Sequence, residues 1–210
     1  MSQAILAQRD TPKSRRTRAR ILDEAVQVIA AQGYAATTNA AVAEAAGITR
    51  GAMLYHFPTR EALLEAAIEH IQQQRAALFR EAADSLPPGA DVTEHAIETY
   101  WDLLHRTPFV AFAELETAAR TDELVRALLA PSLAEFDRAQ IGDHFLKMLH
   151  AGAGPRFQAS RDLARFMLEG LARAQVTYDR DQRVERLLAV IKRATHMLNR
   201  KGGVTDLWPE

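Results

Sequence analysis

The segment Thr37–Phe57, TTNAAVAEAAGITRGAMLYHF, constrains the fold of this chain more than any other part. It contains two stretches that are each too short to form a stable helix alone. Gly47 lies between them, and glycine readily adopts the left-handed backbone that a tight turn requires. Thr38 and Thr49 precede the two stretches, where a hydroxyl can cap the first helical turn. The segment therefore predicts two short helices joined as a helix-turn-helix.

The second of these helices carries side chains that suit a DNA groove. In a helix-turn-helix, the N-terminal end of the second helix faces the bases in the major groove. Here that end reads Thr49, Arg50, Gly51 and Ala52. Arginine can reach guanine or a phosphate, and small neighbours let the backbone approach the bases. Tyr55 and His56 end the helix with groups that can contact phosphate oxygens, and Arg60 opens the next helix.

The pattern of the whole chain is helical. No stretch alternates apolar and polar residues over a strand's length, so an all-α fold is expected. In the N-terminal part, Val42, Ile48 and Leu54 are expected to pack the short helices against the helix before them. Helices are expected near residues 14–31, 39–46, 50–56, 59–84, 92–106, 109–119, 122–150 (interrupted or kinked at Pro131), 159–177 and 182–200, with a loop at 151–155.

Charge is distributed unevenly along the chain. Residues 1–60 hold eight basic and four acidic residues, whereas the remaining residues hold 18 basic and 23 acidic residues. A basic N-terminal part indicates a polyanionic partner, although a solvated tail has the same composition. The basic run is Lys13, Arg15, Arg16, Arg18 and Arg20, which either adds phosphate contacts or only improves solubility.

Composition excludes several classes of protein. The chain has 210 residues, 48% of them hydrophobic, and no cysteine, so disulfide scaffolds and cysteine nucleophiles are excluded. No secretory signal and no apolar run of 18 residues is present, so we expect a cytoplasmic protein with no membrane partner. Glu-x-x-His and His-Glu-x-x-His spacings and a glycine-rich phosphate loop are missing too. We therefore expect no catalytic residue, no metal site, no cofactor and no enzyme activity.

Residues 18–64 resemble the DNA-binding domain of the tetracycline-repressor (TetR) family of transcriptional regulators. The matching positions are Arg20-Ile21-Leu22, Ala25, Gly33-Tyr34, Thr37-Thr38, Val42-Ala43, Ala46-Gly47-Ile48, Gly51, Tyr55, His56-Phe57 and Leu63. Two positions depart from the usual pattern. Ala41 stands where the family often has an acid, and Arg60 replaces a common lysine.

The resemblance implies a homodimeric regulator with two domains. Residues 1–60 would form the DNA-binding domain with its basic arm, and residues 61–210 would bind a small effector and dimerise. A repressor that a small molecule releases from a palindromic operator is the function expected. The implied DNA contacts are Thr37, Thr38, Thr49, Arg50, Gly51, Ala52, Tyr55, His56 and Arg60. For Thr38 and Thr49, a helix cap and a DNA contact are both open.

The C-terminal part offers candidates for the effector pocket and the dimer interface. Large side chains of the middle helices would either line a pocket or build an ordinary core, and the pocket candidates are Trp101, His105, Phe109, Phe112 and Phe136. Apolar stripes of the last two helices would either pair two subunits or pack internally, and the interface candidates are Phe166, Met167, Gly170, Leu171, Leu187 and Ile191. Two alternatives remain: a helical-bundle enzyme or metal-binding protein, and a sequence-tolerant architectural DNA-binding protein.

Overall fold

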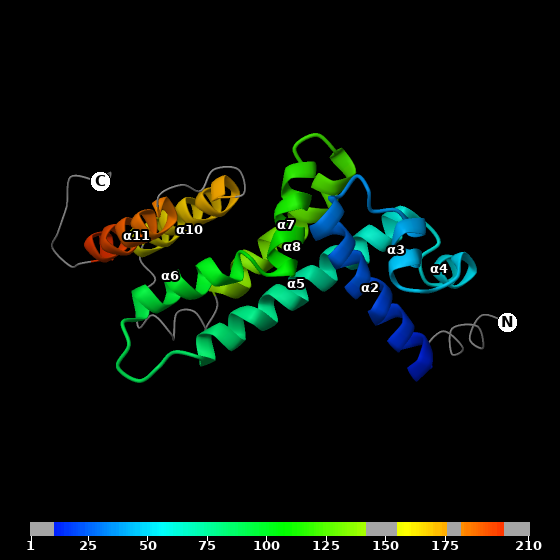
Figure 1. Ribbon diagram of the computed structural model, residues 1–210, viewed down its shortest axis with the longest axis horizontal. Coiled ribbons are helices and arrows are strands. Elements are labelled where there is room, and N and C mark those ends of the chain that lie inside the picture. The colour runs from blue at the N-terminus through cyan, green and yellow to red at the C-terminus, as the bar shows by residue number, and fades with distance from the viewer. Residues whose placement is uncertain (1–10, 142–154, 176–181, 200–210) are drawn as a thin grey trace. The chain divides into compact units, whose positions relative to one another are not determined.

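The computed structural model describes residues 11–141, 155–175 and 182–199, and for residues 135–141, 155–157 and 175 it describes the backbone alone. Within these ranges all regular structure is helical, which confirms the predicted all-α class (Figure 1). The nine helices described are α2 (Pro12–Gln32), α3 (Asn39–Ala45), α4 (Arg50–His56), α5 (Arg60–Asp84), α6 (Val92–Leu103), α7 (Thr107–Ala118), α8 (Glu123–Ile141), α10 (Pro155–Gln175) and α11 (Arg183–Asn199).

The helix α8 runs through Pro131 without a break, so the predicted interruption is wrong, and the alternative of a kink stays a prediction. Pro131 is exposed, so water can satisfy the carbonyl that loses its helical partner. The rest of the expected helix to residue 150, and the expected loop before Pro155, lie outside the described residues.

The helices form two compact units. The first unit holds residues 1–77 and 107–136, and the second holds residues 78–106 and 137–210. Helix α5 therefore contributes its first turns to one unit and its last turns to the other. The resemblance implies a different division, at residue 60, between a DNA-binding domain and an effector-binding domain. That division concerns function and stays a prediction.

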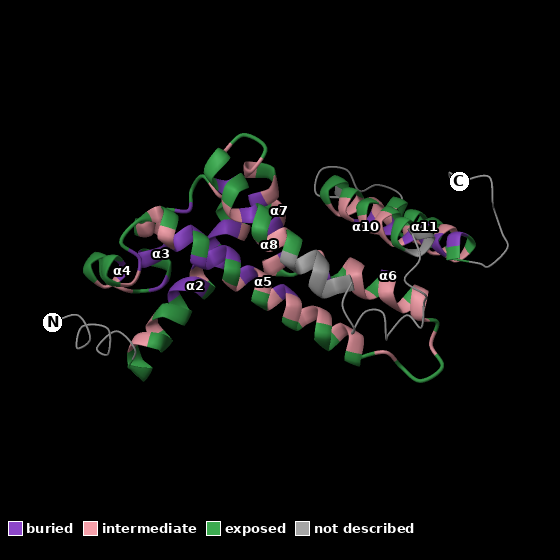
Figure 2. Cartoon of the chain, turned by 180° about the vertical axis from the view of Figure 1, so that it is seen from behind, coloured by how far each residue is buried: buried purple, intermediate pink, exposed green. Residues whose placement is uncertain are grey.

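The first unit has one apolar core. Buried positions run along α2 and the first part of α5, as Figure 2 shows, and α3, α4, α7 and α8 add to them. Representative fully buried side chains are Ile21, Ile29, Val42, Met53, Leu63, Ile71, Leu115 and Leu129. Burial of this many large apolar side chains is the main force that holds the short α3 and α4 in place.

The expectation that Leu54 packs in the core was wrong. Leu54 is 41% exposed, whereas its neighbour Met53 is 1% exposed and Phe57 is 2% exposed. Consecutive helical residues are rotated by about 100°, so residues four apart share a face. Met53 and Phe57 therefore form the inner face of α4, and Leu54 points to the surface.

The second unit has a smaller core where α6, α10 and α11 meet. Its buried members are Ile97, Ala164, Leu168 and Ile191. Polar pairs flank this core: Lys192 donates to Glu98, and His196 Nε2 lies 3.4 Å from Asp91 Oδ1. These contacts fix α11 against α6.

Candidate functional site

Helices α3 and α4 form the helix-turn-helix that the sequence predicted. The hydroxyl of Thr38 accepts from the backbone N–H of Ala41 at 3.1 Å, and that of Thr49 accepts from Ala52 at 3.2 Å. Gly47 adopts the expected left-handed conformation, with φ of +59°. Both threonines are therefore helix caps, and DNA contacts by the same residues stay a prediction.

The orientation of α4 is fixed by contacts at its C-terminal end. Asn39 Nδ2 at the start of α3 donates to the backbone carbonyl of Phe57 at 2.9 Å. The guanidinium carbon of Arg18 lies 5.1 Å from the centroid of the Phe57 ring. Phe57 is itself buried. It therefore connects the end of α4 with the start of α3 and with the first half of α2.

The outer face of α4 is open to solvent. Arg50 and Gly51 are exposed at its N-terminal end, and Tyr55 is 45% exposed one turn later. A Cβ atom added at Gly51 would meet nothing closer than Thr49 Oγ1, at 4.0 Å. The protein itself therefore does not require glycine here, which fits a backbone that another molecule approaches closely.

Basic side chains are also exposed along the start of α2, in the same unit as α4. The described cations near the start of α2 are exposed, and they are Lys13, Arg15, Arg16, Arg18 and Arg20. Together with Arg50 they give the unit the positive surface that phosphate backbones require. Burial first, and the nearby Arg18 second, lower the pKa of His56 below its usual 6.5, so its imidazole is neutral at pH 7.

Arg60 and Thr37, both predicted DNA contacts, have partners inside the protein. Arg60 Nε donates to the Thr37 carbonyl at 2.8 Å, and Nη2 donates to the Tyr34 carbonyl at 2.9 Å. The Arg60 guanidinium carbon lies 4.4 Å from the Tyr34 ring centroid. Thr37 is 4% exposed and its hydroxyl donates to the Gly33 carbonyl at 3.0 Å. These contacts hold the α2–α3 turn, and a DNA contact at either residue stays a prediction.

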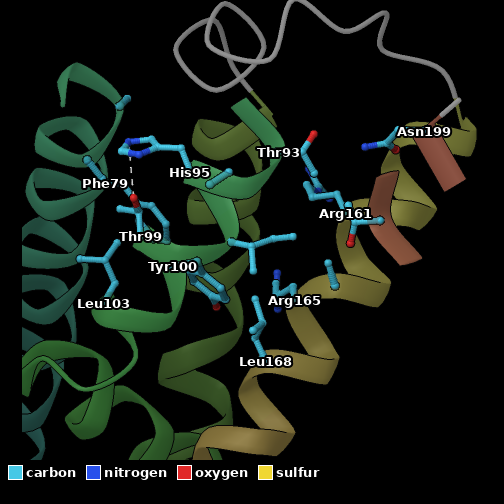
Figure 3. Close-up of a pocket in the computed structure, with 16 residues that line it drawn as sticks. Phe79, Thr93, His95, Thr99, Tyr100, Leu103, Arg161, Arg165, Leu168 and Asn199 are labelled. Carbon is cyan, nitrogen blue, oxygen red and sulfur yellow. Dashed lines mark hydrogen bonds between the residues drawn. The ribbon is translucent and has the colours of Figure 1, made fainter. Parts of the chain in front are cut away.

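A cavity of about 110 Å³ lies within the second unit, where α5, α6, α10 and α11 line it (Figure 3). Its apolar wall includes Phe79, Ala96, Ile97, Leu103, Ala164 and Leu168. Its polar lining includes Thr93, His95, Thr99, Arg161, Arg165 and Asn199. An apolar space with a few converging polar groups is the usual form of a small-molecule site.

None of the five pocket residues predicted from the sequence is among the described residues that line this cavity. Trp101 and His105 contact each other, with ring centroids 4.7 Å apart. Phe109 and Phe112 are buried in the first unit beneath the guanidinium of Arg75. The side chain of Phe136 lies outside the described residues. Large aromatic side chains fill space, whereas small ones leave it open. The sequence feature that indicates this cavity is therefore the set of alanines at 82, 83, 96 and 164.

The interface candidates of α10 and α11 divide between two faces. Ile191 is 5% exposed, and Met167 and Leu171 pack against the core of their own unit. Phe166 is 60% exposed and Leu187 is 36% exposed, and Gly170 is exposed as well. Leu163, a member of the predicted stripe of α10, is 48% exposed too, and the exposed apolar residues that the sequence prediction did not include are Val190 and Met197.

The described ranges hold neither a cluster of metal ligands nor a helix that could span a membrane. In those ranges, His, Cys, Asp and Glu side chains do not gather in threes as a metal ion would need. The described helices also include none with the length and apolar character to cross a bilayer.

Comparison with known proteins extends these observations. Residues 21–67 match the sequence model described as bacterial regulatory proteins, tetR family. The HTH-type transcriptional regulator TtgR of Pseudomonas putida is 33% identical over 85 residues, which is 40% of each protein. The HTH-type transcriptional regulator CymR, also of Pseudomonas putida, is 29% identical over 133 residues, or 63% of this chain and 65% of CymR. The match thus spans less than two thirds of either regulator.

Solved structures share the fold over nearly the whole chain. The crystal structure of the multidrug binding protein EbrR complexed with imidazole aligns with a TM-score of 0.57 and 24% identity, over 90% of this chain and 98% of that one. The matched residues 21–67 contain the capped helix-turn-helix, the buried inner face of α4 and the start of α5. Residues 21–67 are therefore similar to the bacterial regulatory proteins of the tetR family, and the likeness in fold extends over 90% of the chain.

Proposed function

We propose that this protein is a sequence-specific DNA-binding transcriptional regulator. The observation that carries the proposal is the exposed N-terminal end of α4, where Arg50 and Gly51 face solvent in the same unit as the basic start of α2. A rigid helix with an accessible arginine and a sterically free glycine can place its backbone against base edges. The proposed contacts are Thr37, Thr38, Thr49, Arg50, Gly51, Ala52, Tyr55, His56 and Arg60.

A homodimer would supply the second half of the recognition surface. One such helix reads only a short half-site, and two, about 34–36 Å apart, read a palindrome. The outer faces of α10 and α11 offer an interface because Phe166, Val190 and Met197 are each more than half exposed. Exposed apolar stripes on adjacent helices are typical of helix pairs that pack against a second copy.

The cavity of the second unit is the proposed effector site, and repression is the proposed mode of action. An effector lowers DNA affinity only by the ratio of its affinities for the two conformations of the protein. Helix α5 is the physical link available for this effect, because it is continuous from the residues after α4 to the wall of the cavity.

Selection of bound duplexes from a random pool tests the proposal. We expect one palindromic sequence to be enriched, and Arg50→Ala to cost about 1–3 kcal/mol at one base pair. Arg80→Ala, which removes an exposed arginine from the far part of α5, is the matched control and should bind as the wild type does. Equal binding to unrelated duplexes would favour the sequence-tolerant architectural protein instead.

A further inference from the structure

The charged lining of the second unit's cavity is cationic. Arg161 and Arg165 lie one helical turn apart on α10, and both line the cavity (Figure 3). No aspartate or glutamate is among the described residues that line it. Of the described guanidinium and carboxylate groups, a ligand in this space can therefore contact the guanidinium groups and not a carboxylate.

Arg165 is held in place by a carboxylate behind the wall. Its Nε donates to Glu169 Oε1 at 3.1 Å, and the Tyr100 hydroxyl donates to the same oxygen at 2.7 Å. The side chains of Arg165 and Glu169 are 26% and 19% exposed, so this pair is partly shielded from water. Glu169 compensates the charge of Arg165 and also fixes the ring of Tyr100.

Arg161 has a weaker partner. Its Nε and Nη2 donate to Asp162 Oδ1 at 3.0 and 2.7 Å, but the Asp162 side chain is 41% exposed. An ion pair this accessible to water contributes little to stability. A ligand's carboxylate could therefore replace Asp162 as the partner of Arg161 at little cost in free energy. Thr93 of α6 and Asn199 of α11 lie at the same end of the cavity in Figure 3, where a hydroxyl and an amide can assist.

The rest of the cavity wall is mainly apolar, although His95 and Thr99 also line it. The rings of Phe79 and Tyr100 stack with centroids 5.8 Å apart and planes 19° apart. Ile97 and Leu168, both nearly fully buried, complete the wall. The cavity thus combines a compact apolar chamber with a cation at one end.

We propose that the effector is an amphipathic carboxylate. Its compact apolar or aromatic body would lie against Phe79, Tyr100 and Leu168, and its carboxylate would form a bidentate pair with Arg161. Charge-assisted, bidentate pairs with arginine are the strong hydrogen bonds of proteins, which gives the carboxylate its advantage over a neutral group of the same shape. The proposal rests on the proposed function, in which this cavity takes the effector.

Isothermal titration of the full-length protein with matched probe pairs tests the ligand class. The pairs are benzoate and benzamide, 3-phenylpropionate and 3-phenylpropionamide, and octanoate and octanamide. We expect at least one carboxylate to bind about tenfold or more tightly than its amide. Arg161→Gln should abolish this preference, and Arg161→Lys should keep part of it because the charge remains. Arg193→Gln, at an exposed position of α11 outside the cavity lining, is the control and should keep all of it.

The result separates this proposal from the proposed function. No carboxylate preference in any pair, or an undiminished preference in Arg161→Gln with native helicity by circular dichroism, overturns the ligand class. Binding of the wild type and Arg161→Gln to the selected duplex is measured in parallel without any probe. If the wild-type protein does not bind the duplex, the DNA-binding function is refuted. The titration with the probe pairs still decides the ligand class in that case.

Discussion

The hydroxyl of Tyr34, in the turn after α2, donates a hydrogen bond to Oδ2 of Asp122 at 2.9 Å. Asp122 Oδ1 accepts from the backbone N–H of Val125 at 3.1 Å and so caps the start of α8. Arg60 Nη1 donates to the Tyr34 hydroxyl at 3.2 Å. One tyrosine therefore connects the turn that leads into the helix-turn-helix, the first residue of α5 and the α7–α8 connection.

Removal of the Tyr34 hydroxyl is expected to destabilise the first unit. Tyr34→Phe keeps the ring against Arg60 but leaves Asp122 without its side-chain donor, so the free energy of unfolding should fall by about 0.5–1.5 kcal/mol. Urea denaturation followed by circular dichroism measures the change. Tyr55→Phe, at a 45% exposed position of α4, is the comparison and should lower stability less than Tyr34→Phe does. Equal stability of wild type and Tyr34→Phe would show that the bond contributes nothing.

The Asp122 carboxylate should make stability depend on pH in the acid range. The hydrogen bond from the Val125 backbone, and then the one from Tyr34, hold the pKa of Asp122 below its usual 3.8. A carboxylate with a lowered pKa in the folded state stabilises the fold above its unfolded pKa, and this stabilisation disappears as pH falls through the folded pKa. Unfolding free energies of wild type and Asp122→Asn should therefore converge below about pH 4. A gap that stays constant from pH 7 to pH 3 would contradict this assignment.

The sequence was informative wherever the interactions are local. The caps at Thr38 and Thr49 and the turn at Gly47 depend on neighbours within a few residues, so their residue types predicted them. The bond between Tyr34 and Asp122 joins residues 88 apart, and no local pattern indicates it. The bonds of Arg60 to the α2–α3 turn are likewise not indicated by any local pattern, because they form only in the folded unit, and the DNA contact at Arg60 stays a prediction.

Gly51→Ala should separate DNA binding from stability. A methyl group at this position meets no atom of the protein closer than 4.0 Å, and alanine favours the helix by up to about 1 kcal/mol. The variant should therefore be as stable as the wild type or more stable. If the backbone of α4 approaches base edges, the same methyl group should weaken binding to the selected duplex. Thermal unfolding and gel-shift titration measure the two effects, and unchanged affinity would place the backbone away from the bases.

His56 should couple DNA binding to protonation. Its pKa is lowered in the free protein by burial and by Arg18, so little of the imidazolium exists at pH 7.5. A phosphate beside the ring would raise that pKa and favour proton uptake on binding. Affinity for the duplex should therefore increase more between pH 7.5 and pH 6 in the wild type than in His56→Gln. Identical pH dependence of the two proteins would remove His56 from the set of phosphate contacts.

Charge placed on the outer faces of α10 and α11 should prevent dimerisation. Phe166 is 60% exposed and Val190 is 59% exposed, so a glutamate at either position is solvated in a monomer and costs the isolated fold little. In a dimer that buries these faces, the same carboxylate would lose its water without gaining a partner. Phe166→Glu and Val190→Glu should elute as monomers in size-exclusion chromatography with light scattering, and their affinity for the palindrome should fall. Leu124→Glu, at a 40% exposed position of α8 in the first unit, is the matched control and should stay dimeric. Dimers that persist in both interface variants would show that the subunits associate through another surface.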